Sequence, residues 1–160
     1  SLHLSRVADE EELYTALNSL FSMGEEAVVE TAITGREVTC GVLGEEALAP
    51  ILVVSKGKYF DYHNKYAPDG AEEICPAPIS AEDTAKVQDC ALRAHKALGL
   101  KGYSRADFIL QDDGTLYILE VNTTPGMTAT SLVPREAAVR GMSFADLVER
   151  LLELALQGGR

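Results

Sequence analysis

The sequence has little positive charge, few cysteines and no long apolar run. Only 14 lysines and arginines stand against 25 aspartates and glutamates, a formal net charge of −11 at pH 7. A protein held to nucleic acid by its net charge needs an excess of cations for the phosphates, so that class is excluded. No apolar run approaches the roughly 20 residues that a membrane span requires. We therefore expect neither a nucleic acid nor a membrane as a partner.

The cysteines and histidines form no pattern that is typical of a metal site. Cys40, Cys75 and Cys90 are widely spaced and contain no C-x-x-C pair, which predicts small core residues and favours a protein of the reducing cytoplasm. His63 and His95 have no partner at metal-ligand spacing, and we expect surface or capping roles for them. No secretory signal is present. The chain does not begin with methionine, and we expect it to be part of a longer polypeptide.

What the sequence does contain indicates one globular domain. Its 160 residues, 46% hydrophobic and 24% charged, suit a domain that folds without a disulfide or a metal. Helical and strand spacings of apolar residues follow one another without regular alternation, which favours an α+β fold. The predicted elements are a helix from Asp9 to about Gly24, strands over Ala27–Ile33, Val38–Leu43, Leu48–Ser55 and Tyr59–Tyr62, an ordered loop over 63–79, a helix between Ser80 and Gly99, strands over Gly102–Leu110 and Thr115–Asn122, and helices that begin at Ser131 and Ser143.

Residues 102–122 predict a β-hairpin with one polar face. Asp113-Gly114 between two alternating strands is typical of a two-residue type I′ turn. With that turn, Asp107 lies opposite Glu120 and Arg105 lies opposite Asn122. Because side chains alternate along a strand, these four share one face. The same alternation adds Ile109 and Ile118 to that face and assigns the opposite, core face to Ala106, Phe108, Leu110, Tyr117, Leu119 and Val121.

The opposition of Asp107 and Glu120 needs an explanation, since like charges directly opposite each other destabilise a sheet. Two carboxylates about 4 Å apart repel by roughly 4 kcal/mol at an effective dielectric near 20. Two carboxylates and the Asn122 amide oxygen are hard ligands that suit Mg²⁺, which leaves coordination places for phosphates. A solvated face with a salt bridge from Arg105 explains the same pattern, and a one-residue shift in register would separate the pair.

The loop after the hairpin is free of charge and rich in small hydroxyl residues. Residues 121–134 contain Pro125-Gly126 and a candidate helix cap at Ser131, with Pro134 tolerated in the first turn. Backbone N–H groups in such a loop and at a helix N-terminus favour a carboxylate or a phosphate. An ordinary threonine-rich connection produces the same pattern.

Together these motifs resemble the D-alanine–D-alanine ligases of the ATP-grasp superfamily. The resemblance rests on Glu120-Val-Asn-Thr-Thr-Pro-Gly-Met-Thr with Ser131-Leu-Val-Pro, on Gly102-Tyr-Ser-Arg-Ala-Asp, on Phe60-Asp-Tyr-His-Asn-Lys-Tyr, and on Glu30-Thr-Ala-Ile-Thr-Gly-Arg-Glu. It covers essentially the whole chain. It implies the C-terminal part of an ATP-grasp fold, an antiparallel sheet covered by helices on one face. It also implies the tail of a small lobe (a helix and a strand) over 1–29 and a large lobe over 30–160.

The resemblance implies a role for each matching residue. Asp107, Glu120 and Asn122 would bind two Mg²⁺ ions, or Mn²⁺ in their place. Arg105 and the Gly126 amide would stabilise the oxyanion of a tetrahedral intermediate. The other implied roles are contact with the γ-phosphate and the substrate carboxylate for Lys65, ordering of the substrate loop for Tyr66, binding of the substrate carboxylate for Ser131 and Leu132, packing of adenine for Glu30, Thr31, Ala32 and Ile33, hydrogen bonding to ribose for Glu37, and cover of the phosphates for Ser1.

The implied activity is the ATP-dependent joining of two D-alanines, for peptidoglycan synthesis, by a cytoplasmic homodimer. We expect the family's N-terminal domain, with its first D-alanine site, to lie before residue 1, and we expect this chain alone to be inactive. One alternative is a related ligase that joins D-alanine to D-lactate or D-serine, which Lys65-Tyr66 disfavours. Another is a non-catalytic nucleotide-binding module. The presence of the complete set Arg105, Asp107, Glu120 and Asn122 disfavours it.

Overall fold

The computed structural model describes residues 3–55 and 71–158, and the chain divides into two compact units. Residues 1–34 with 55–71 form the first unit, and residues 35–54 with 72–160 form the second. Among the described residues, no helix is both long and apolar enough to cross a membrane. The predicted strand Tyr59–Tyr62 lies outside the described residues, and the predicted lobe boundary after residue 29 stays a prediction.

The described part of the first unit contains helix α1 (Glu10–Ser22). Its predicted cap is confirmed, since the Asp9 side chain accepts a hydrogen bond of 2.9 Å from the Glu12 N–H. The predicted strand Ala27–Ile33 is wrong, because no strand forms there. A strand needs the hydrogen bonds of a neighbour, and none of the described strands pairs with this segment. Val28 is accordingly 86% exposed.

The second unit is built on a six-stranded sheet with the order β4-β3-β1-β5-β6, in which β2 also pairs with β1. The strands are β1 (Arg36–Leu43), β2 (Glu46–Ala47), β3 (Ile51–Ser55), β4 (Ala71–Ile74), β5 (Tyr103–Leu110) and β6 (Leu116–Asn122). The pairs β1–β2, β1–β3, β1–β5 and β5–β6 are antiparallel. The predicted α+β class and antiparallel sheet are confirmed. Strand β4 falls where a loop was predicted, because its polar sequence has no strand pattern and pairing beside β3 decides its structure.

Helix α3 (Ala81–Ala97) covers one face of the sheet. Its predicted cap is confirmed, since the Ser80 side chain accepts a hydrogen bond of 3.0 Å from the Asp83 N–H. Gly99 follows the helix with a φ of +64°, a conformation that glycine adopts without steric cost. The buried cluster between helix and sheet consists of Val38, Cys40, Val42, Val87, Ala91, Ala106, Phe108 and Leu110.

The expected surface or capping role of His95 is wrong. This residue of α3 is only 3% exposed, and its Nδ1 lies 2.7 Å from the Ser104 hydroxyl oxygen in a buried hydrogen bond. The expectation of a surface position failed because β5 brings Ser104 to this side chain. His63 lies outside the described residues.

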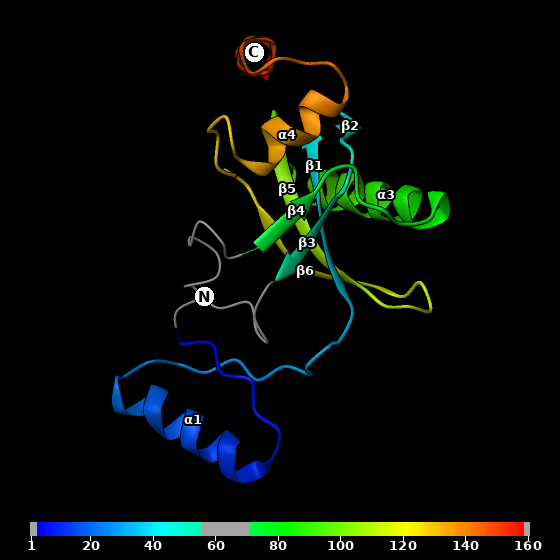
Figure 1. Ribbon diagram of the computed structural model, residues 1–160. Helices are drawn as coiled ribbons and strands as arrows, with labels where there is room; N and C mark the ends of the chain where they lie inside the picture. The colour runs from blue at the N-terminus through cyan, green and yellow to red at the C-terminus, as the bar shows by residue number, and fades with distance from the viewer. Residues whose placement is uncertain (1–2, 56–70, 159–160) are drawn as a thin grey trace. The chain divides into compact units, whose positions relative to one another are not determined.

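The opposite face of the sheet carries helices at one end. Leu43 follows Val42 on β1 and therefore points to the other face, where it is buried with residues of α4 (Leu132–Val139) and α5 (Phe144–Gly158). Figure 1 shows α4 in front of the ends of β1 and β5, with α3 along the far side of the strands. Within the described part of this unit, the rest of this face is left without a helix.

The hairpin turn differs from the prediction. The Gln111 N–H donates to the Thr115 carbonyl at 2.9 Å, and the Gly114 N–H donates to the Gln111 carbonyl at 3.0 Å. Gly114 has a φ of +80°. The loop therefore has three residues, with a left-handed glycine at its end, which is a common hairpin connection. This shifts the pairing near the turn by one position, so Leu110 lies opposite Leu116.

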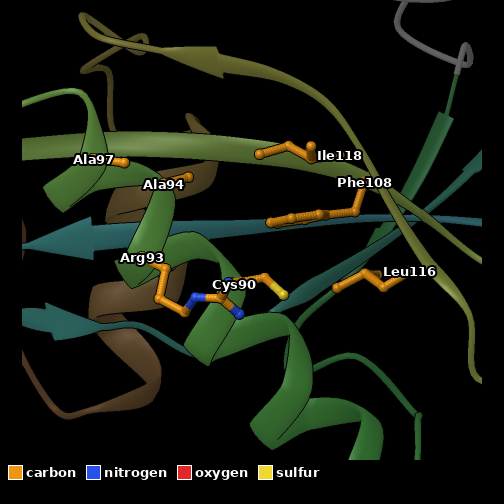
Figure 2. Close-up of a pocket in the computed structure, with 7 residues that line it drawn as sticks. All are labelled: Cys90, Arg93, Ala94, Ala97, Phe108, Leu116 and Ile118. Atoms are coloured by element: carbon orange, nitrogen blue, oxygen red, sulfur yellow. The ribbon is translucent and has the colours of Figure 1, made fainter.

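A β-bulge restores the predicted pairing farther along the hairpin. Phe108 pairs with Ile118 whereas Asp107 pairs with Glu120, so Leu119 is the extra residue of the bulge. The predicted faces of Tyr117, Ile118 and Leu119 are therefore wrong. Figure 2 shows Ile118 beside Phe108 on the side of the hairpin that faces α3, where both line a shallow cavity, and Leu119 is 56% exposed.

Candidate active site

Four polar residues of the hairpin lie on the sheet face opposite α3. Along β5, Ser104, Ala106, Phe108 and Leu110 are buried while the residues between them are half-buried, so Arg105 and Asp107 point away from α3. The register pairs Arg105 with Asn122 and Asp107 with Glu120. The predicted opposition of these residues is thereby confirmed, although the hairpin has a three-residue loop in place of the predicted two-residue turn.

Arg105 and Asp107 form a two-pronged ion pair. The Nε of Arg105 donates to Oδ1 of Asp107 at 2.8 Å, and Nη2 donates to Oδ2 at 2.7 Å. The two side chains are only 11% and 22% exposed. Burial by itself lowers the pKa of Arg105, but the hydrogen bonds and charge of Asp107 outweigh it and raise that pKa above its ordinary value. The charge-assisted pair therefore holds the guanidinium on this face as a cation.

A threonine that the sequence did not single out also holds Asp107. Thr39 lies opposite Asp107 on β1, is 3% exposed, and its hydroxyl lies 2.5 Å from Oδ1 of Asp107 and 3.2 Å from the Ala106 carbonyl oxygen. The hydroxyl thus orients the carboxylate from the neighbouring strand. Sequence reasoning missed it because only the pairing of β1 with β5 brings Thr39 to this position.

The donor set of Asp107, Glu120 and Asn122 fits a hard divalent cation. Two carboxylates and one amide supply oxygen atoms only, which Mg²⁺ prefers while keeping places for water or phosphate. Glu120 is exposed, and the Asn122 side-chain oxygen accepts a hydrogen bond of 3.0 Å from the Thr124 N–H. In the part of the chain that the structure describes, no three His, Cys, Asp or Glu side chains cluster as a metal site, so a cation here would need the amide and other ligands besides the two carboxylates.

A fully buried carboxyl group, that of Glu136, lies next to this face. Glu136 of α4 is fully buried, and its Oε2 accepts a hydrogen bond of 2.7 Å from the Gly41 N–H. Burial raises the pKa of Glu136 well above its ordinary value, while the Gly41 N–H and the Arg105 guanidinium oppose that rise. A Cβ at Gly41 would clash with Oε2, so a side chain there would displace the Glu136 carboxyl group.

Hydrogen bonds of hydroxyl groups hold the loop between β6 and α4 in its fold. The Ser131 hydroxyl accepts a hydrogen bond of 3.0 Å from the Thr128 N–H and lies 2.8 Å from the Thr128 hydroxyl oxygen. Ser131 is the residue before α4, as predicted, but its side chain makes no capping hydrogen bond. A Cβ at Gly126 would come within 3.1 Å of that hydroxyl, so glycine allows the loop to fold tightly.

The remaining predicted site residues are distributed over both units. Glu37 lies on β1 opposite Ile109, and Leu132 begins α4. Glu30, Thr31 and Ala32 of the first unit are exposed, and Ile33 is half-buried. Lys65, Tyr66 and Ser1 lie outside the described residues. The structure thus brings together the predicted metal residues and Arg105, while the predicted roles of the other residues stay predictions.

Known proteins match this chain over its whole length. The D-alanine–D-alanine ligase of Lawsonia intracellularis is 57% identical over 160 residues, which is 100% of this chain and 53% of that protein. The D-alanine–D-alanine ligase of Nitratidesulfovibrio vulgaris is 60% identical over 157 residues, 98% of this chain and 52% of that protein. The chain therefore spans about half the length of the curated relatives it matches.

Solved structures match the fold as well. The Bacillus anthracis D-alanine–D-alanine ligase complexed with ATP has a TM-score of 0.79 at 34% identity, covering 94% of this chain and 49% of that one. The D-Ala:D-Ser ligase VanG of Enterococcus faecalis has a TM-score of 0.81 at 31% identity, covering 95% and 45%. The family described as the D-ala D-ala ligase C-terminus matches residues 1–153. This chain belongs to that family.

Proposed function

We propose that this chain is the nucleotide- and metal-binding half of a ligase that joins two D-alanines at the expense of ATP. The observation that carries the proposal is the placement of Arg105, Asp107, Glu120 and Asn122 on one sheet face by the hairpin register. Relatives that are 57% and 60% identical carry the name D-alanine–D-alanine ligase. The solved relative with ATP supports ATP as the nucleotide.

In the proposed reaction, the γ-phosphoryl group of ATP moves to the carboxylate of one D-alanine, which gives an acyl phosphate and ADP. The amine of a second D-alanine attacks the acyl carbon, phosphate leaves, and the amine loses a proton as the peptide bond forms. A bound Mg²⁺ supplies positive charge that neutralises the phosphate oxygens. Asp107, Glu120 and Asn122 would hold two Mg²⁺ ions, with Mn²⁺ as a substitute.

Arg105 and the Gly126 N–H are the proposed donors to the oxygen that becomes negative when the amine attacks. A donor fixed before the reaction stabilises that charge without reorganising, and the ion pair with Asp107 keeps the guanidinium charged on this face. Ser131 and Leu132 bind the carboxylate of the second amino acid through backbone and hydroxyl groups. The enzyme is proposed to act in the cytoplasm as a homodimer and to use no membrane or nucleic acid.

The other proposed roles keep the residues that the resemblance implies. Glu30, Thr31, Ala32 and Ile33 pack against adenine, Glu37 accepts hydrogen bonds from ribose, and Ser1 covers the phosphates. Lys65 contacts the γ-phosphate and the substrate carboxylate, and Tyr66 orders the substrate loop. D-Alanine is the proposed second substrate, because the curated relatives at 57–60% identity are named for it, whereas VanG, at 31% identity, is named for D-serine.

The test uses a protein that joins the N-terminal half of the Nitratidesulfovibrio vulgaris relative to this chain, called here the hybrid enzyme. Supplied with Mg-ATP and D-alanine, the hybrid enzyme is expected to release phosphate and to form D-alanyl-D-alanine, detected by mass spectrometry. Parallel reactions with D-lactate or D-serine as the second substrate measure the preference. A faster reaction with either of these than with D-alanine would replace the proposed substrate.

The metal assignment is tested separately by calorimetry with Mg-ATP. Glu120→Gln in the hybrid enzyme is expected to weaken binding by at least about tenfold, because a metal site loses a charged ligand. Glu149→Gln, which changes an exposed carboxylate on α5, is the matched control and is expected to bind like the unchanged protein. Equal binding by the Glu120 variant, or binding that does not depend on Mg²⁺, contradicts the metal assignment.

A further inference from the structure

One carboxylate oxygen beside the candidate site has no partner although it is buried. Glu136 uses Oε2 to accept the Gly41 N–H, but its Oε1 is buried without any hydrogen bond. A buried polar atom without a partner costs free energy, so its presence calls for an explanation. The close fit of Oε2 against Gly41 fixes the carboxyl group at that point of β1.

Arg105 is a cation on the same face of the sheet as that carboxyl group. It lies directly opposite Gly41 in the register of β1 and β5, and its side chain is 11% exposed. Its guanidinium and the Glu136 carboxyl group influence each other electrostatically. The guanidinium donates hydrogen bonds from Nε and Nη2 to Asp107. Its Nη1 donates to none of the residues that the structure describes. A guanidinium has five N–H donors, so Arg105 has capacity for a second carboxyl group.

The ion pair of Arg105 with Asp107 conflicts with a cation on the same carboxylate. A divalent ion bound to Asp107 would stand beside the guanidinium, and like charges at such distances repel strongly in a poorly solvated site. The guanidinium then has to turn from Asp107 toward another acceptor. A largely buried guanidinium that lost its partner altogether would carry a large desolvation cost.

We propose that Glu136 is a positioning residue whose free Oε1 receives the Arg105 guanidinium when Asp107 binds a divalent cation. This inference rests on the proposed function of the hairpin face as a Mg²⁺ site. The exchange keeps Arg105 on the sheet face, held by a carboxyl group that is itself anchored to Gly41. Glu136 thereby lowers the cost of metal binding and keeps the guanidinium in place for the negative charge that develops on the substrate.

The test is Glu136→Gln in the hybrid enzyme. Glutamine keeps an oxygen for the Gly41 N–H but places a donor where Oε1 stands, so it cannot receive the guanidinium. We expect the Mg²⁺ concentration for half-saturation of binding to a non-hydrolysable ATP analogue, measured by calorimetry, to rise by about 10- to 100-fold, the range typical of residues that support metal ligands. We expect kcat to fall by a similar factor while the KM for D-alanine stays within about twofold.

A control and a double variant separate positioning from simple support of α4. Glu73→Gln removes a carboxylate that pairs with Arg135 of α4 and is expected to leave the Mg²⁺ dependence unchanged. In a protein that already carries Arg105→Ala, the Glu136 change is expected to have no further effect on Mg²⁺ binding, because residues that act together are not additive. An equal further loss in that background overturns the inference.

Three other results are decisive. Unchanged Mg²⁺ dependence and kcat in Glu136→Gln, or a lowered melting temperature alone, overturns the positioning role while the proposed function stands. A hybrid enzyme that binds no Mg-ATP without any substitution removes the proposed function and the inference together. If the glutamine variant does not fold, Glu136→Asp replaces it, since the shorter side chain cannot reach Gly41 and Arg105 together, and wild-type Mg²⁺ affinity in that variant overturns the inference.

Discussion

Two carboxyl groups in different surroundings are associated with the strand pair that carries Arg105. Asp107 is half-buried and holds the guanidinium at two points, while Glu136 is fully buried and holds β1 at Gly41. A guanidinium that a carboxyl group keeps charged on this face of the hairpin suits the stabilisation of a developing oxyanion.

Arg105→Ala in the hybrid enzyme is expected to lower kcat by about two to three decades while the KM for ATP changes little. The loss of one fixed donor to an oxyanion typically costs about 2.7–4 kcal/mol, and an interaction made mainly in the transition state affects kcat rather than KM. Arg105→Lys keeps the charge but loses the planar fork, so it is expected to be impaired too. Steady-state kinetics at saturating Mg-ATP measure both.

The matched control is Arg93→Ala, which removes an exposed arginine of α3 that pairs with Asp89 within the same helix. It is expected to keep full turnover. If Arg105→Ala lowers the melting temperature or the Mg²⁺ affinity but keeps near-normal kcat, Arg105 only steadies the hairpin and the oxyanion role is wrong.

His95 makes a prediction about stability and pH. Burial lowers the pKa of His95 below its ordinary value, so between pH 7 and pH 5 the unfolded chain takes up a proton more readily than the folded one. Stability is therefore expected to fall as pH decreases through this range, with a slope of at most about 1.4 kcal/mol per pH unit from this one group. Urea unfolding at several pH values measures the slope, and His95→Gln is expected to flatten it. An unchanged slope in that variant contradicts the prediction.

At the scale of elements, the hairpin shows how a correct pairing was predicted from an incorrect turn. Asp113-Gly114 indicated a two-residue turn, whereas the loop has three residues and shifts the register by one. The bulge at Leu119 shifts it back, so Asp107 still lies opposite Glu120. A bulge has no reliable signature in an alternating sequence. The opposition of Asp107 and Glu120 could be predicted, but the faces of Tyr117, Ile118 and Leu119 could not.

Other elements show the same division between local and long-range signals. The capped helices α1 and α3 were predictable, because the cap side chain and the N–H group that donates to it lie three residues apart in the sequence. The strand β4, the absent strand Ala27–Ile33, and the positions of Thr39 and Glu136 depend on partners far along the chain. The site residues that sequence reasoning missed are those held by such long-range contacts.

At the scale of the whole molecule, the proposed site residues are divided between two units. Glu30 to Ile33 belong to the first unit, while Arg105, Asp107, Glu120 and Asn122 belong to the second. The chain covers about half of each curated relative, 53% of the Lawsonia intracellularis protein and 52% of the Nitratidesulfovibrio vulgaris protein. Reactions that bring three substrates together need all of them to be held at once, so half of such a protein is expected to be insufficient.

The last prediction is that these 160 residues fold but catalyse no ligation by themselves. The two buried clusters of the second unit supply a core, so the chain is expected to unfold cooperatively on heating, as followed by circular dichroism. Phosphate release with Mg-ATP and D-alanine is expected to stay at background for the chain and to rise in the hybrid enzyme. The hybrid enzyme with Arg105→Ala serves as the control for contaminating ATPases. Sustained dipeptide formation by the chain alone would show that these 160 residues suffice for catalysis and that the N-terminal half of the relatives is dispensable.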